Sequence, residues 1–310
     1  MRQRARKLSW KETALSFGTT WDQVCQAVEY VVQWGLEHRE LGTLRAIGVD
    51  EIHIGQSHKF LTLVYQIEAD CVRLLWVGKD RTMKSFEGFF TLIGKDMAGK
   101  VEFVCSDVIL QKRRPYPEMI ARHCPQALNI LDRFHMVAKL NKALDAVRAG
   151  EARRMLREGY EPVLKKKRWC LLKRPENLTD KQRFSLRELL GYNLKSVRAY
   201  LLKEEFQLFW EYTSPAWAAK FLDAWCKRAM RSRIEPVKRF ARTVRSHREL
   251  LLNCFKAKKQ FSSGIIEGLN NKGKVTVGKV YGYRTFRITE LSLSHVLGRL
   301  PEPKLAHKFF

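Results

Sequence analysis

The chain has 310 residues, 45% of them hydrophobic and 11% aromatic, which is enough to bury a core in one large domain or two ordinary ones. Its 58 Lys and Arg residues outnumber the 32 Asp and Glu residues, and the formal net charge is +26. Because this surplus is spread along most of the chain, it favours a polyanionic partner, most simply nucleic acid. A ribosomal-type or merely basic protein would have the same charge balance.

The cysteine pattern and the N-terminus exclude several further classes. The seven cysteines are scattered, odd in number and never spaced as C-x-x-C, so neither a disulfide framework nor a zinc ribbon is predicted. Met1 is followed by "RQRARK" and an amphipathic segment, with no apolar stretch long enough for a signal peptide or a membrane span. We therefore expect a cytoplasmic protein without a membrane partner, associated with the nucleoid when it binds DNA.

Residues 1–43 predict two short helices joined at Gly18. Ser9 with Glu12 three residues later, and Thr20 with Gln23 three residues later, are helix starts of the capping-box type. This arrangement is typical of a helix-turn-helix DNA-binding segment. A plain helical hairpin used for packing fits the same pattern equally well.

Residues 44–150 predict an α/β sheet. Apolar runs at 45–54, 59–68 and 72–78 indicate three antiparallel strands, and they are followed by a helix at 82–94, a strand at 100–107, a helix at 117–124, a strand at 127–132 and a helix from Phe134 to about Arg157. This order is the order of a ribonuclease H-like mixed five-stranded sheet. In that fold the first strand lies centrally, beside the fourth, so acids on those two strands can meet.

Residues 151–260 contain no convincing strand and hold 28 Lys and Arg against 12 Asp and Glu. They predict a large basic α-helical insertion in the sheet domain, with residues 261–310 completing the core. Helical spacing accounts for most aromatic residues of the insertion, so we expect them in its core more than on a base-stacking surface.

Three acids are candidates for catalysis. Asp50 and Asp107 fall near the ends of the first and fourth predicted strands, where α/β sheets commonly bind ligands and metals. In "FSSGIIEGLNNKGK", a helix capped by Ser262 or Ser263 would carry Glu267 on the same face as the residues Asn270, Asn271 and Lys274. That face suits a metal-binding acid flanked by phosphate-contacting groups. Three carboxylates suit two Mg²⁺ or Mn²⁺ ions, which catalyse in-line displacement at phosphorus.

Four stretches resemble the ISL3 insertion-sequence family of DDE transposases, from about residue 10 to the end. They are "IGVDEIHI", "VCSD", "NILDRFHMVAKLNKALDAVR" and "SSGIIEGLNNKGK…YGYRTF". The resemblance implies that Asp50, Asp107 and Glu267 form a metal-binding triad. It also implies the reaction, in which water hydrolyses a phosphodiester at the element's end and the freed 3′-hydroxyl attacks target DNA.

The resemblance suggests roles for two further groups of residues. Asp132 and His135 in "LDRFH" match a D-x-x-H pair that supports the active site in related transposases. The alternative is that Asp132 caps the following helix and His135 is partly buried. Near the C-terminus, a second group is expected to stack on or neutralise transposon-end DNA, or else to close the fold as a surface cluster: Lys274, Lys279, Tyr281, Tyr283 and Arg284.

Alternation along the strand places Glu51 on the opposite face from Asp50, and His53 on the same face as Glu51. We therefore expect the loss of Glu51 to be mild for catalysis.

The sequence also departs from the family pattern. Family members usually begin with a cysteine-rich zinc-binding segment, so this sequence is expected to be N-terminally truncated. Two alternatives to an active transposase are a catalytically inactive copy that only binds DNA and a structure-specific nuclease on the same fold. By analogy, the double-stranded DNA partners are terminal inverted repeats and target DNA, bound by a homo-oligomer.

Overall fold

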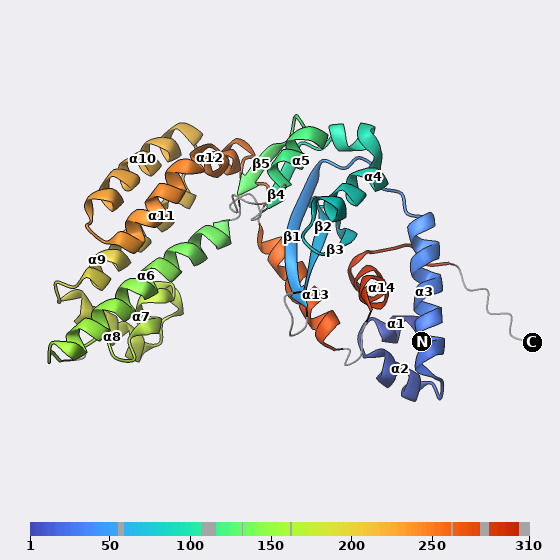
Figure 1. Cartoon of the computed structure of the whole chain (residues 1–310), viewed down its shortest axis with the longest axis horizontal. Coiled ribbons are helices and arrows are strands. Elements are labelled where there is room, and N and C mark those ends of the chain that lie inside the picture. Colours follow the sequence, from blue (N-terminus) through green and yellow to red (C-terminus); the bar gives the residue numbers. More distant parts are fainter. Residues whose placement is uncertain are drawn as a thin grey trace, which may run out of the picture. The chain divides into compact units, whose positions relative to one another are not determined.

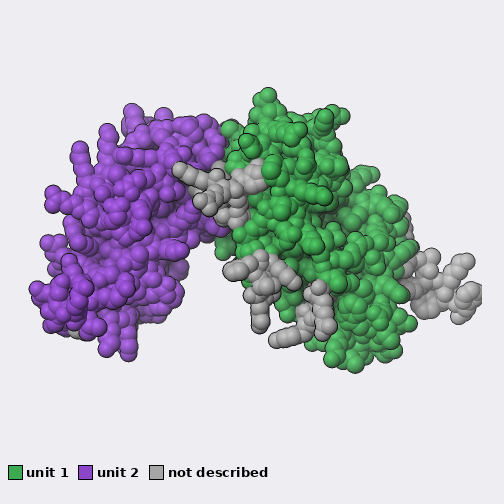
Figure 2. Space-filling view, viewed as in Figure 1, with its two compact units in different colours: residues 1–131, 261–310 green, residues 132–260 purple. Residues whose placement is uncertain are grey.

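The structure, a computed structural model, describes residues 1–54, 59–106, 116–131, 133–161, 163–261, 263–279 and 285–303. The chain forms two compact units, coloured separately in Figure 2. Unit 1 comprises residues 1–131 and 261–310, and unit 2 comprises residues 132–260. No helix in these described ranges is long and apolar enough to cross a membrane.

Unit 1 is built on a mixed five-stranded sheet in the order β3-β2-β1-β4-β5 (Figure 1). The strands are β1 (Ala46–Ile54), β2 (Lys59–Ile67), β3 (Val72–Lys79), β4 (Phe103–Ser106) and β5 (Leu128–Leu131). The first three strands are antiparallel, and β4 runs parallel to β1 and to β5. The expected central position of the first strand, beside the fourth, is confirmed.

Two helices, α4 (Met83–Gly99) and α5 (Tyr116–His123), cover one face of the sheet. Alternate residues of β1 point to this face, where Ile47 and Val49 pack with Phe86 and Phe89 in a fully buried cluster. Burial of such side chains stabilises the fold by about 2 kcal/mol each.

The opposite face is covered by α13 (Ser263–Gly278) and α14 (Phe286–Leu297), which return to the sheet after unit 2. Helix α13 contacts β1 and β2, and α14 contacts β3 (Figure 1). Sequence segments more than 200 residues apart therefore meet at β1.

The N-terminal segment forms α1 (Arg2–Ala5), α2 (Trp10–Ser16) and α3 (Trp21–Glu37). The predicted capping box at Ser9 is present, and the Thr20 hydroxyl accepts a hydrogen bond from the backbone N–H of Gln23, 3.3 Å away.

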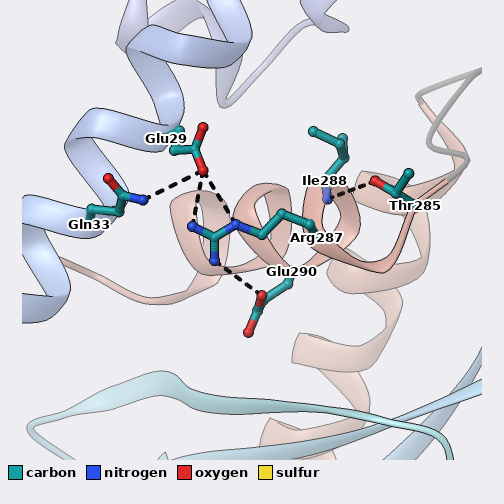
Figure 3. Close-up of polar contacts among 6 residues, drawn as sticks. All are labelled: Glu29, Gln33, Thr285, Arg287, Ile288 and Glu290. Atoms are coloured by element: carbon teal, nitrogen blue, oxygen red, sulfur yellow. Dashed lines mark hydrogen bonds and ion pairs between the residues drawn. The ribbon is translucent and has the colours of Figure 1, made fainter.

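Helix α3 packs its apolar stripe on α14. Val24, Val28 and Val32 are buried against Leu291, and Arg287 pairs with Glu29 at 3.0 Å at the edge of this contact (Figure 3). Helix α3 carries three acids and no Lys or Arg. This charge differs from the positive surface that phosphate contacts require.

The described residues of unit 2 form helices joined by turns and loops, with no strand among them. Its helices are α6 (Arg133–Arg157), α7 (Arg168–Leu172), η2 (Pro175–Asn177), α8 (Asp180–Leu190), α9 (Lys195–Leu208), η3 (Phe209–Glu211), α10 (Pro215–Arg231), α11 (Glu235–Ser246) and α12 (Arg248–Lys256). Most of α6 was expected in the sheet domain. Because unit 2 begins at residue 132, the helix belongs to unit 2 by its packing.

Aromatic residues of unit 2 divide between core and surface. Phe206 lies at the centre of the core, with its ring 4.8 Å from that of Trp225 and 5.2 Å from that of Phe240. By contrast, Trp169 and Trp217 are more than half exposed. The expected burial in the core therefore holds for some aromatic residues of unit 2, whereas others lie on its surface.

Candidate active site

Asp50 lies at the centre of β1, as the fifth of its nine residues, and faces α13. The expectation that Asp50 falls near the end of the strand is wrong, because residues 51–54 also pair with β2. The carboxylate thus projects from the middle of the sheet's central strand. Such a position holds a side chain more rigidly than a loop does.

Both oxygens of the Asp50 carboxylate accept hydrogen bonds from described residues. Its Oδ1 accepts from the backbone N–H of Glu51 at 2.7 Å, and its Oδ2 accepts from the side-chain amide of Asn270 on α13. The Asn270 Oδ1 in turn accepts from the hydroxyl of Tyr65 on β2 at 2.8 Å. Tyr65 is fully buried and Asn270 is 5% exposed.

Charge and burial act together on Tyr65. Burial, with a smaller contribution from the negative charge of Asp50, raises the pKa of Tyr65 well above its usual value. The phenol therefore stays protonated at neutral pH, where it can donate a hydrogen bond.

Helix α13 approaches β1 at Gly48, two residues before Asp50. A Cβ at this position would lie 2.6 Å from Cδ1 and 2.8 Å from Cγ1 of Ile266, so a larger residue would require Ile266 or its helix to shift. Ile266 is buried, and one turn later Asn270 reaches Asp50. The contact between Gly48 and Ile266 thus allows α13 to pack close to β1.

The sequence placed four residues on one face of α13, but the structure divides them between the buried and the exposed side of the helix. Glu267, Asn271 and Lys274 are exposed, whereas Asn270 is buried with both ends of its amide bonded inside the protein. This corrects the expectation that Asn270 contacts DNA, because its donor and acceptor are used in the fold. Further along the chain, the exposed Lys279 donates from Nζ to the Lys7 carbonyl oxygen at 2.8 Å.

Asp107 lies outside the described residues. The residue before it, Ser106, pairs with Val49 in the parallel ladder of β4 and β1, and Val49 is the residue before Asp50. In the sequence, each candidate acid therefore directly follows one member of this residue pair. Ser106 is 2% exposed, and its hydroxyl has no hydrogen-bond partner among the described residues.

Glu51 lies on the other face of β1, as alternation predicted. Its Oε2 pairs with Arg81 Nε at 3.1 Å, and its Oε1 accepts from the Tyr116 hydroxyl at 3.4 Å. The Glu51 side chain is 8% exposed. His53 is exposed and lies edge-on to Phe60. Glu51 is thus part of the contact between the sheet and α5.

Some expected site residues fall outside the described ranges: Asp107, Asp132, Tyr281, Tyr283 and Arg284. His135 is partly buried near the start of α6, in unit 2. Within the described ranges no three His, Cys, Asp or Glu side chains come close enough together to hold a metal. Asp50 on the central strand offers carboxylate oxygens, the ligands that Mg²⁺ and Mn²⁺ prefer.

The central strand with its carboxylate, the parallel neighbour and the returning helix define an α/β protein with an acid-centred candidate site. A family model described as a transposase matches residues 47–292. The chain belongs to this family, the ISL3 family of DDE transposases.

Two transposases similar to the chain support the same family. The chain is 30% identical to a transposase for insertion sequence element IS1001 of Bordetella parapertussis, over 77% of this chain and 57% of the relative. It is 28% identical to a transposase for insertion sequence element IS1557 of Mycobacterium tuberculosis, over 78% of this chain and 57% of that relative. The chain thus spans just over half the length of these curated relatives.

Tyr65 and Gly48 belong to the site but were not singled out from the sequence. A glycine inside a strand is a signal of close approach by another element, and Gly48 stands two residues before Asp50. Tyr65 has no comparable signal, because a buried tyrosine in a strand is ordinary core. Its hydroxyl partner lies 205 residues away in the sequence.

Proposed function

We propose that the chain is the catalytic portion of an insertion-sequence transposase that cuts DNA at the element's ends and joins the freed 3′-hydroxyl to target DNA. The observation that carries this proposal is the pairing of Val49 with Ser106, each followed directly by a candidate acid. Helix α13, which carries Glu267, is held on the same strand through the bond between Asn270 and Asp50.

The sheet order and the return of the last helices to the central strand support a ribonuclease H-like core. In such a core, Asp50, Asp107 and Glu267 are the DDE triad. These three carboxylates would hold two Mg²⁺ or Mn²⁺ ions, which when bound activate the attacking oxygen and stabilise the leaving one. The residues of the chain position the carboxylates and hold the DNA.

DNA binding is assigned to both units. In unit 1, the exposed residues Asn271, Lys274 and Lys279 are the proposed DNA contacts, together with Tyr281, Tyr283 and Arg284. In unit 2, 32 Lys and Arg residues stand against 14 Asp and Glu residues, so this unit carries +18 of the formal net charge of +26. Such a surplus suits a phosphate-binding surface.

Three further roles complete the proposal. Asp132 and His135 support the active site, and the N-terminal helices contact DNA as a helix-turn-helix. The acidic charge of α3 opposes this last role, because phosphate contacts favour Lys and Arg. On DNA the protein acts as a homo-oligomer, as a synaptic complex of two element ends requires.

The proposal is tested with duplex DNA that carries the inverted repeats bordering the coding sequence, and with a target plasmid. We expect nicks at the repeat ends and joined products in Mg²⁺ or Mn²⁺, and neither in EDTA. Asp50→Asn should lose both reactions and keep its affinity for the repeats. Binding without cleavage by the wild-type chain would indicate a DNA-binding protein only. Cutting without preference for the repeats and without joining would indicate a nuclease.

A further inference from the structure

Three side chains from three elements form one hydrogen-bonded chain that ends on the candidate catalytic carboxylate. The Tyr65 hydroxyl of β2 donates to Asn270 Oδ1 at 2.8 Å, and the Asn270 amide of α13 donates to Asp50 Oδ2 on β1. The first two residues are buried, and neither is among the acids expected to bind metal. Their polar groups are therefore directed at Asp50 and not at solvent.

The direction of this chain follows from the chemistry of its members. A protonated phenol can donate to the carbonyl oxygen of an amide, and the amide nitrogen can only donate. The Tyr65 hydroxyl thus fixes the amide of Asn270 with its oxygen toward Tyr65 and its nitrogen toward Asp50. Without that donor, a half-turn of the amide would point its oxygen at the Asp50 carboxylate, and two acceptors would then repel each other.

Packing alone does not explain a buried asparagine at this position. Ile266 already seats α13 on Gly48 one turn earlier, and Gly273 lies against Ile52, Leu293 and Leu297 one turn later. An apolar side chain at position 270 would fill the same space without the cost of burying an amide. The polar pair is thus better explained by what it does to Asp50.

We propose that Asn270 is a positioning residue that holds the Asp50 carboxylate in its catalytic orientation, and that Tyr65 acts through Asn270 by fixing the amide. This inference rests on the proposed function, in which Asp50 takes part in the reaction. It divides the adjacent pair in "EGLNN": Asn270 orients the catalytic acid, and Asn271 faces outward to the DNA.

The two neighbouring asparagines give a matched pair for the test. Asn270→Ala should lower the rate of cleavage at saturating DNA by about 10- to 100-fold, the usual cost of losing a residue that orients a metal ligand. Its Kd for the repeats should change less than about twofold. Asn271→Ala should show the reverse pattern, a weaker Kd with a smaller change in the saturated rate.

Tyr65→Phe keeps the ring and removes only the hydroxyl. We expect its cleavage rate to fall by about three- to tenfold, in line with the loss of one neutral hydrogen bond. In the Asn270→Ala background the same change should have no further effect, because its partner is gone. Thr276→Val, on the buried face of α13, is the packing control, since among the described residues the Thr276 hydroxyl bonds within its own helix, to the Lys272 carbonyl oxygen.

Asn270→Asp provides a readout that a purely structural role would not move. A carboxylate at this position repels Asp50, whereas its protonated form can donate the missing hydrogen bond. The rate of this variant relative to wild type should therefore rise as the pH falls. The relative rate of Asn270→Ala should stay level over the same range.

A metal-free measurement checks the chain of bonds independently of activity. Thermal unfolding of wild type, Tyr65→Phe, Asn270→Ala and the double variant should show a melting-temperature loss in the double variant smaller than the sum of the single losses. Additive losses would overturn the proposal, as would an Asn270→Ala rate equal to wild type while Asp50→Asn is inactive. If Asn270→Ala does not fold, the cleavage rate and the Kd of Tyr65→Phe test the proposal in its place. An Asp50→Asn variant that cleaves normally would instead overturn the proposed function, and the unfolding cycle would still report whether the bonds couple.

Discussion

Gly48 on β1 and Ile266 on α13 touch so closely that the two elements have no room for a methyl group between them. The Cβ of an alanine at position 48 would lie 2.6 Å from Ile266 Cδ1 and 3.1 Å from Ile67 Cγ2. This contact sets the distance from the central strand to the helix that carries Glu267. It is therefore a structural requirement of the proposed triad, although neither residue takes part in chemistry.

Gly48→Ala should displace α13 and lower the free energy of unfolding by about 1–3 kcal/mol, as overpacking does. Gly268→Ala is the matched control, because a Cβ there meets nothing within 4 Å and alanine favours the helix. We expect the control to raise the free energy of unfolding by up to about 1 kcal/mol. Chemical denaturation of both variants measures the difference, and an equal effect of the two changes would refute the contact.

Glu51→Gln tests the separation of the two adjacent acids on β1. The side chain is almost buried; it pairs with Arg81, and its bond from Tyr116 links α5 to the sheet. We expect the variant to be less stable by about 1–3 kcal/mol, since a buried ion pair loses one charge. At a temperature where it remains folded, its cleavage rate should stay within about twofold of wild type. A loss of activity comparable to that of Asp50→Asn would contradict the separation of faces.

The stability of unit 1 should depend on pH through His295. This histidine on α14 is 2% exposed, and neither ring nitrogen has a hydrogen-bond partner among the described residues. Burial, with a smaller contribution from the charges of Arg6 and Arg2, lowers the pKa of His295 to about 4. The unfolded chain binds this proton near pH 6.5, so stability is full above that pH and falls as the pH drops toward 4.

Over that whole range the loss amounts to about 3 kcal/mol. His295→Leu should abolish the corresponding slope of the melting temperature between pH 6.5 and 4. The exposed His38 offers the control, because His38→Asn should leave the slope in place. A slope that survives in His295→Leu would show that other groups produce it.

The basic surface of unit 2 should contribute to DNA affinity through charge and not through sequence. Lys165 and Lys166 are exposed beside the exposed Trp169. Changing both lysines to glutamine should weaken binding to repeat and unrelated duplexes alike and reduce the salt dependence of log Kd by about 1 to 2. A loss confined to the repeats would instead indicate base readout by this surface.

Much of the sheet could be predicted from the sequence because strand periodicity and helix signals are local. Alternating apolar residues around Asp50, and the helix starts at Ser9 and Thr20, determine elements that the structure contains. The strand order followed from the sequence of elements, because few sheet topologies accommodate three antiparallel strands followed by helix crossovers.

The arrangement on α13 could not be predicted in the same way. Adjacent residues on a helix point about 100° apart, so the pattern "NN" does not reveal which asparagine meets the sheet. That choice depends on the rotation of α13 on the sheet, and the close contact between Gly48 and Ile266 is part of that packing. The link from Tyr65 to Asn270 likewise joins segments that only the folded chain brings together.

We propose that Asp50, Asp107 and Glu267 share divalent ions in a DDE active site. Anomalous diffraction from crystals of the chain bound to a repeat-end duplex and soaked in Mn²⁺ tests this sharing most directly. We expect Mn²⁺ peaks within about 2.3 Å of carboxylate oxygens of these three residues, and their loss in Asp50→Asn. Mn²⁺ bound only elsewhere, with the three carboxylates too far apart to share an ion, would contradict the account.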